Sequence, residues 1–166
     1  PVMLLCGWRD PYAQTTSDNY LGISRRPQGN VSMVLGPWLH GKRSFTRAGD
    51  VDFGPEATLD GNIAADYYAF RTDWFDRWLK PLGGNAQDLP PVRYFRMGGG
   101  EGGLTSDGLL RHGGSWQSAN DWPVPNTDFC EFYLHSDGSL SDSKPEDDSA
   151  ALSFEFDPAN PVPTIG

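Results

Sequence analysis

The sequence comprises 166 residues, which is enough for one ordinary hydrophobic core or for parts of two. Its formal net charge of −9 and its scattered Lys and Arg residues argue against a nucleic-acid or anionic-membrane partner, because phosphate groups are bound by clustered basic side chains. No apolar run reaches the ~18 residues of a membrane span, and no metal-ligand spacing of His and Cys occurs, so we expect no membrane segment, no metal and no other cofactor.

The composition favours short strands and tight turns. Gly (20 residues) and Pro (14 residues) together make up about a fifth of the chain, and aromatic residues account for 13%. These proportions are typical of a β-rich architecture with an aromatic core, and not of a helical bundle or a disordered chain. Cys6 and Cys130 each lie within an apolar run, so we expect both to be buried and unpaired.

Two apolar runs near the start of the chain predict neighbouring parallel strands. Val2–Trp8 and Val31–Leu35 have strand length and no polar alternation, as expected for strands that are buried on both faces. Asp10 follows the first run and His40 follows the second. The 30 positions between these two residues match one strand–helix–strand unit of ~30 residues, with a helix over 12–24. We therefore expect both side chains at the same edge of a sheet.

The next segment predicts a surface excursion followed by a long helix. Residues 41–60 are charged and lack periodicity, so we expect them at the surface. From Ile63 onward, apolar residues recur at three- and four-residue spacing, which predicts an amphipathic helix. We expect Asp60 or Asn62 to cap this helix and Pro81 to end it. Its aromatic stripe is interpreted as packing against the sheet.

After Pro90-Pro91 the pattern becomes all-β. Strands are predicted over 92–97, 129–135 and 151–156, and Ser136-Asp137-Gly138 predicts a hairpin turn. The segment 98–114 is rich in Gly and is expected to be mostly loop. Short strands at this spacing favour a sandwich or jelly roll. We therefore predict two domains, 1–89 and 90–166, the first α/β and the second all-β.

Asp10 and His40 are the candidate catalytic residues. A nucleophilic serine needs a base that accepts its proton and an acid that orients the base, and in α/β-hydrolases these residues follow one another as Ser, acid and His. Asp10 and His40 fit the last two members of that order. On the pattern alone, a structural role in two turns is the favoured interpretation, and the catalytic one depends on the resemblance described next. The sequence contains no G-x-S-x-G motif, so no residue of this chain is assigned as the nucleophile.

A set of segments in a fixed order carries a family resemblance. These segments are PVMLLCGWRDPY, MVLGPWLHG, DFG, DWFDRWLK, VRYFRMGGGEG, HGGSW, DWPVPNTDFCEFYLHSDGSLS and FEFDPANPVPTIG. Together they resemble the cocaine esterase/X-prolyl dipeptidyl peptidase family, whose members are serine hydrolases of the α/β-hydrolase fold. The resemblance implies that 1–89 is the C-terminal part of the catalytic domain and that 90–166 begins a jelly-roll-like β-sandwich. It also implies that Asp10 and His40 are triad members and that Tyr12 can contact the acyl group of the substrate, with plain packing of Tyr12 as the alternative.

The expected function is therefore that of a fragment of a serine hydrolase. The parent would cleave a small ester, amide or X-Pro peptide bond through an acyl-enzyme, and its serine would lie upstream, in a part of the same protein that acts as this chain's partner. The 166-residue chain alone is expected to be inactive. Two alternatives remain: a non-catalytic β-sandwich module that binds carbohydrate through Trp116 and Trp122, and an inactive homologue. The sequence leaves the compartment and the formation of a homo-oligomer open.

Overall fold

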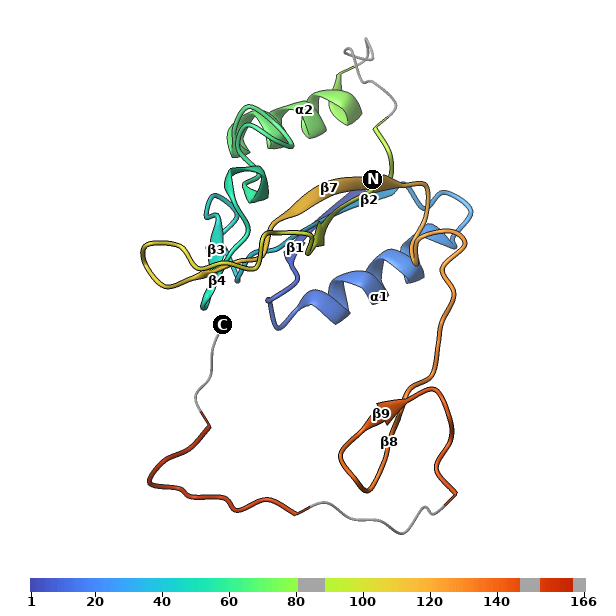
Figure 1. Ribbon diagram of the computed structural model, residues 1–166. Coiled ribbons are helices and arrows are strands. Elements are labelled where there is room, and N and C mark those ends of the chain that lie inside the picture. The colour runs from blue at the N-terminus through green and yellow to red at the C-terminus, as the bar shows by residue number, and fades with distance from the viewer. Residues whose placement is uncertain (81–88, 147–152, 163–166) are drawn as a thin grey trace. The chain divides into compact units, whose positions relative to one another are not determined.

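The computed structural model describes residues 1–80, 89–146 and 153–162 (Figure 1). One compact unit spans Pro1–Pro125 and a second spans Asn126–Thr164. The elements of the first unit are β1 (Val2–Gly7), α1 (Ala13–Ser24), β2 (Val31–Gly36), β3 (Arg47–Ala48), β4 (Val51–Asp52), the 3-10 helix η1 (Pro55–Ala57), α2 (Tyr67–Leu79), β5 (Val92–Met97), β6 (Leu110–Arg111) and β7 (Gly114–Ala119). The second unit contains β8 (Tyr133–Leu134) and β9 (Leu140–Ser141).

The main sheet has the strand order β1-β2-β5-β7. Strands β1, β2 and β5 are parallel, and β7 pairs antiparallel with β5. The β1–β2 pairing stays in register over the whole of both strands and ends with Gly7 opposite Gly36. The prediction of two parallel strands joined by a helix over 12–24 is therefore confirmed, since α1 connects β1 to β2.

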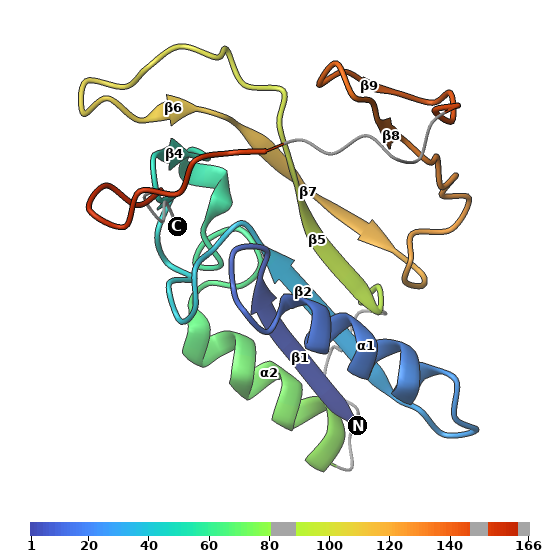
Figure 2. The ribbon, with the colours of Figure 1, turned by 90° about the horizontal axis from the view of Figure 1, so that it is seen from below.

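The two long helices cover opposite faces of the main sheet (Figures 1 and 2). On one face, Met33 and Leu35 of β2 pack in a cluster with Tyr20 of α1. On the other face, Val34 packs with Phe70 of α2. All five side chains are buried, and each contributes about 1.5–3 kcal/mol when it is removed from water. This double cover explains why β2 shows a continuous apolar run in place of alternation.

Helix α2 begins later than the spacing predicts. Its N-cap is Asp66, whose side chain accepts a hydrogen bond from the Ala69 amide, so the expected caps at Asp60 or Asn62 are wrong. The preceding residues form a tight turn because the Leu59 carbonyl accepts hydrogen bonds from the amides of residues 62–64. The helix ends at Leu79, and the expected stop at Pro81 lies outside the described residues.

The segment 41–60 is wrongly predicted as a simple surface excursion. It contains β3, β4 and η1, and it contributes Ala48, Phe53 and Ala57 to a buried cluster with Phe95 of β5. Strand β4 pairs with β3 and, in parallel, with β6, which lies in the Gly-rich segment 98–114. The short strands of this small sheet carry little periodicity, so their burial depends on partners that are distant in the sequence.

The second unit has less regular structure than predicted. The turn at Ser136–Gly138 closes the hairpin of β8 and β9, which confirms that prediction. The strand predicted over 129–135 is reduced to Tyr133–Leu134, and residues 153–156 form no strand, while 151–152 lie outside the described residues. Phe129, Phe132, Phe154 and Phe156 are exposed, as is Cys130, which was expected to be buried. A hairpin alone offers no second sheet on which such side chains could pack.

The described part of the chain thus consists of small mixed sheets with few helices. No helix within it is long and apolar enough to cross a membrane.

Candidate active site

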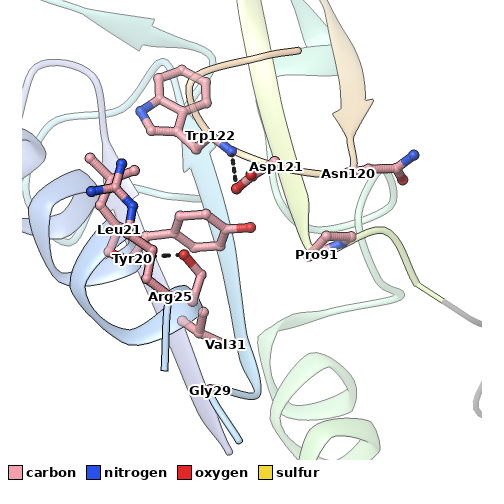
Figure 3. Close-up of a pocket in the computed structure, with 10 residues that line it drawn as sticks. Tyr20, Leu21, Arg25, Gly29, Val31, Pro91, Asn120, Asp121 and Trp122 are labelled. Carbon is pink, nitrogen blue, oxygen red and sulfur yellow. Dashed lines mark hydrogen bonds between the residues drawn. The ribbon is translucent and has the colours of Figure 1, made fainter. Parts of the chain in front are cut away.

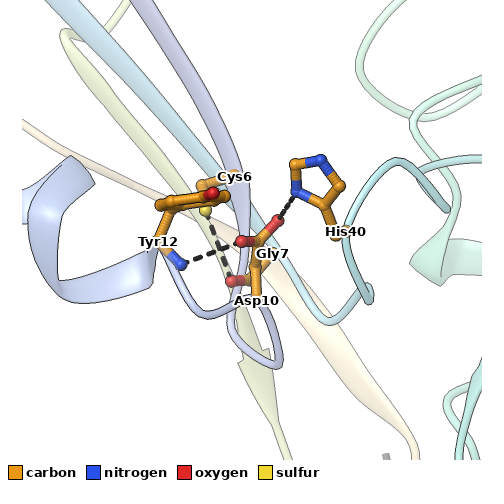
Figure 4. Close-up of polar contacts among 5 residues, drawn as sticks. All are labelled: Cys6, Gly7, Asp10, Tyr12 and His40. Carbon is orange, nitrogen blue, oxygen red and sulfur yellow. Dashed lines mark hydrogen bonds and ion pairs between the residues drawn. The ribbon is translucent and has the colours of Figure 1, made fainter.

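Asp10 and His40 lie in contact beyond the ends of β1 and β2 (Figure 4). The His40 Nδ1 atom is 2.8 Å from Asp10 Oδ2. The contact follows from the topology, because the carboxyl ends of two adjacent parallel strands place their following turns at one edge of the sheet. The side chain of Asp10 is only 5% exposed, whereas that of His40 is 70% exposed.

Both carboxylate oxygens of Asp10 are engaged. Oδ1 accepts a hydrogen bond from the Tyr12 amide at 2.9 Å, and Oδ2 faces His40. The Asp10 backbone forms a turn, in which its amide donates to the Gly7 carbonyl and its own carbonyl accepts from Ala13 at the start of α1. The turn therefore fixes the direction of the Asp10 carboxylate without any contact from a substrate.

Two turns meet at this edge of the sheet: the acid turn, which follows β1 and carries Asp10, and the histidine turn, which follows β2 and carries His40. Backbone hydrogen bonds join them directly. The Trp8 amide donates to the Gly36 carbonyl at 2.8 Å, and the Arg9 amide donates to the Trp38 carbonyl at 3.2 Å. This approach requires Gly at position 7, since a Cβ atom there would lie 2.0 Å from the Trp38 carbonyl oxygen. The β1–β2 ladder is in this way extended past the strand ends, toward the two titratable side chains.

The two nitrogens of the His40 ring differ in their surroundings. If Nδ1 donates to Asp10, the neutral ring carries its lone pair on Nε2. Among the residues that the structure describes, no hydrogen bond reaches Nε2. The ring of Tyr12 lies 5.6 Å from that of His40 at an interplanar angle of 62°, and Tyr12 is 58% exposed. Tyr12, the predicted substrate contact, thus lies beside the histidine at the surface.

Cys6 is buried beneath the acid turn, and its thiol is not activated as a nucleophile. Burial raises the pKa of the Cys6 thiol; a hydrogen bond with Thr16 opposes this rise, and the negative charge of Asp10 adds to it. A thiol with a raised pKa is a poor nucleophile at neutral pH. Both cysteines are free, as the sequence predicted.

The tryptophans around the site belong to the core. Trp38 is 3% exposed, and Trp8 packs against the buried cluster on the α1 face. Trp116 packs on Trp38 with a centroid distance of 5.7 Å, and Trp122 packs on Trp8 at 5.8 Å. The rings of Trp116 and Trp122 are thus engaged by other rings, which counts against their use as a carbohydrate platform.

A polar cavity lies at the opposite end of β2 from His40 (Figure 3). Its volume is about 290 Å³, and Tyr20, Arg25, Asp121 and Trp122 contribute to its lining. Burial and the nearby Asp121 raise the pKa of the Tyr20 hydroxyl. Within the described part of the chain, no cluster of three or more His, Cys, Asp or Glu side chains is arranged to hold a metal ion.

Sequence reasoning missed the residues that hold the two turns together. The hydrogen bond from Trp8 to the carbonyl of Phe95 joins residues 87 positions apart. The close approach at Gly7 could only have been suspected from the glycine that precedes Trp8 in GWRD. No local pattern identifies the partner in either case.

Comparison with known proteins gives a consistent assignment. Residues 84–161 match the sequence family described as the X-Pro dipeptidyl-peptidase C-terminal non-catalytic domain. The whole chain is 28% identical to cocaine esterase from Rhodococcus sp. (strain MB1 Bresler) over 174 aligned positions, which cover 27% of that protein. The chain therefore spans about a quarter of the length of this curated relative.

Solved structures share the fold. An aminopeptidase from the marine sediment archaeon Thaumarchaeota archaeon matches 98% of this chain and 24% of its own, with a TM-score of 0.55 and 23% identity. A CocE/NonD family hydrolase from Staphylococcus aureus matches 87% of this chain and 21% of its own, with a TM-score of 0.51 and 16% identity. The family match and the curated relative both support the resemblance of the chain to the cocaine esterase/X-Pro dipeptidyl-peptidase family, and the solved structures share its fold.

Proposed function

We propose that this chain supplies the acid and the histidine of a Ser-Asp-His triad in a serine hydrolase. The observation that carries the proposal is the 2.8 Å contact between His40 Nδ1 and Asp10 Oδ2 at the carboxyl ends of two parallel strands. The serine and the oxyanion hole would come from a segment of the parent protein that precedes this chain. Hydrolases among the relatives support the same reaction class.

In the proposed mechanism, His40 moves protons and Asp10 holds His40. The Nε2 atom accepts the proton of the serine hydroxyl as its oxygen attacks the scissile carbonyl, and the Asp10 carboxylate stabilises the resulting imidazolium. His40 then gives this proton to the leaving alcohol or amine. In the second half, water loses a proton to Nε2 and attacks the acyl carbonyl. Nε2 then returns the proton to the serine oxygen as the bond between the acyl group and that oxygen breaks, which releases the acid product and the free serine.

The domain assignment is part of the same proposal. Residues 1–89 would complete an α/β-hydrolase catalytic domain, and residues 90–166 would begin a jelly-roll-like β-sandwich. The bond cleaved would be that of a small ester, an amide or an X-Pro peptide, with Tyr12 against the acyl group. Because the nucleophile lies outside the chain, the 166 residues alone would form no acyl-enzyme.

The test is fluorophosphonate labelling of the parent protein, with p-nitrophenyl ester turnover measured in parallel. We expect His40→Ala to abolish labelling and to lower kcat by ~10⁴–10⁶-fold, and Asp10→Asn to lower it by ~10⁴-fold. His135→Ala is the matched control, since His135 lies in the second unit and bonds to Ser141. A parent that labels normally with His40→Ala would contradict the assigned roles, and a parent that does not label at all would favour the inactive homologue.

A further inference from the structure

We propose that Trp8 and Trp116 are positioning residues for the Asp10–His40 pair, so that β5 and β7 hold the acid and the histidine in place. The catalytic meaning of this inference rests on the proposed function. Strands β5 and β7 lie within residues 84–161, the segment that matches a domain described as non-catalytic. They nevertheless belong to the same sheet as β1 and β2.

The acid turn is attached to β5 through Trp8. Trp8 precedes Asp10 by two residues, and its indole Nε1–H donates to the Phe95 carbonyl at 2.8 Å. The amide of Trp8 simultaneously donates to Gly36, so both ends of the residue are fixed. The indole therefore connects the turn that carries Asp10 to a strand that lies two places away in the sheet.

The histidine turn is attached to β7 through two indoles that pack against each other at a tilted angle. Trp38 precedes His40 by two residues and packs on Trp116 of β7. The Nε1–H of Trp38 donates to the Ala57 carbonyl at 2.7 Å, and that of Trp116 donates to the Glu56 carbonyl, also at 2.7 Å. Two adjacent carbonyls of η1 thus fix both rings.

These attachments matter because His40 has little support of its own. Its side chain is 70% exposed, and in the described part of the chain its only hydrogen bond is that to Asp10. A single hydrogen bond contributes little net free energy, so it cannot by itself hold an exposed ring in one place. The geometry of the pair must therefore come from the turns, and the tryptophans determine where the turns lie.

The first test uses the parent protein and a spectroscopic readout. Trp8→Phe and Trp116→Phe retain an aromatic ring but remove the indole donor, and Trp78→Phe on α2 is the matched control, since Trp78 packs only on Trp74 among the described aromatic rings. Imidazole ¹⁵N–¹H spectra report which ring nitrogen of His40 carries the proton. We expect a single Nδ1–H form in the wild type and the control, and a mixture of the two tautomers in Trp8→Phe and Trp116→Phe.

An unchanged Nδ1–H signal in both variants would overturn the inference. If a Phe variant fails to fold, benzothienylalanine at the same position retains the ring volume and removes only the N–H donor, so the prediction can still be contradicted.

The second test measures turnover in the parent protein. A displacement of ~1 Å at a reacting group costs ~10²-fold, so we expect Trp116→Phe to lower kcat by ~10- to 100-fold with KM unchanged, and Trp78→Phe to leave kcat unchanged. A rise in KM at constant kcat would overturn the positioning role. If the wild-type parent has no activity, the proposed function fails, whereas the tautomer measurement still decides the positioning role.

Discussion

Replacing Gly7 by Ala should separate the acid turn from the histidine turn. A Cβ atom at position 7 would lie 2.0 Å from the Trp38 carbonyl oxygen and 2.7 Å from its carbon, although real Cβ contacts stay above 3.0 Å. The obstacle is backbone, so it cannot rotate away, and the two turns must part by about 1 Å. The hydrogen bonds from Trp8 to Gly36 and from Arg9 to Trp38 lie at the same place and would be lost or stretched.

The expected cost follows from these contacts. Two backbone hydrogen bonds at about 1 kcal/mol each, with buried polar groups left unpaired, predict a loss of about 2–4 kcal/mol in the free energy of unfolding. Gly22→Ala is the matched control, because Gly22 lies in α1 with nothing within 4 Å of its Cβ position. The control should raise stability by about 0.5–1 kcal/mol.

Urea denaturation of the wild-type chain and both variants measures this difference. In Gly7→Ala, the imidazole spectrum of His40 should also lose its single Nδ1–H form. A Gly7→Ala chain that is as stable as the wild type and keeps this signal would refute the argument that the close approach holds the turns together.

Three further predictions concern stability. Asp66→Ala should lower the free energy of unfolding by about 1 kcal/mol by removing the α2 cap, while Asp73→Ala on the exposed face of the helix should not. Burial raises the pKa of Cys6 above its ordinary 9.0, so above pH 9 the folded state keeps a proton that the unfolded chain loses, and the free energy of unfolding falls as the pH rises. Cys6→Ala should flatten this fall when urea denaturation is measured at several pH values, and Cys130→Ala should not. Tyr20→Phe should leave stability unchanged or raised, since no hydrogen bond reaches the hydroxyl from the described residues; a clear loss would reveal a partner.

The sequence allowed the main strands and the Asp10–His40 contact to be predicted because both depend on local order. The run of buried residues in β2 and the turns after Gly7 and Gly36 are properties of neighbouring residues. The start of α2 was not predictable in this way, since several residues could serve as the cap and the Leu59 carbonyl collects the amides of the preceding turn.

Elements that depend on distant partners were predicted poorly. Phe53 lies in a segment without periodicity, and it is buried because Phe95 packs on it at a centroid distance of 6.2 Å. The opposite error affects Phe129 and Phe154, where strand-like composition occurs without a neighbouring strand to pair with among the described residues. A residue's tendency toward strand becomes a strand only when a second backbone lies beside it.

The continuous pairing from β2 to β5 has a consequence for recombination between family members. Residues Met33, Val34 and Leu35 align with Val92, Arg93 and Tyr94 across a parallel ladder, which crosses the domain boundary proposed at residue 89. A chimera joined at that boundary would combine β2 of one parent with β5 of another, together with mismatched partners for Trp8. A junction after Pro125, where the first compact unit ends, leaves the ladder within a single parent. Libraries built on this family should therefore place their crossovers there.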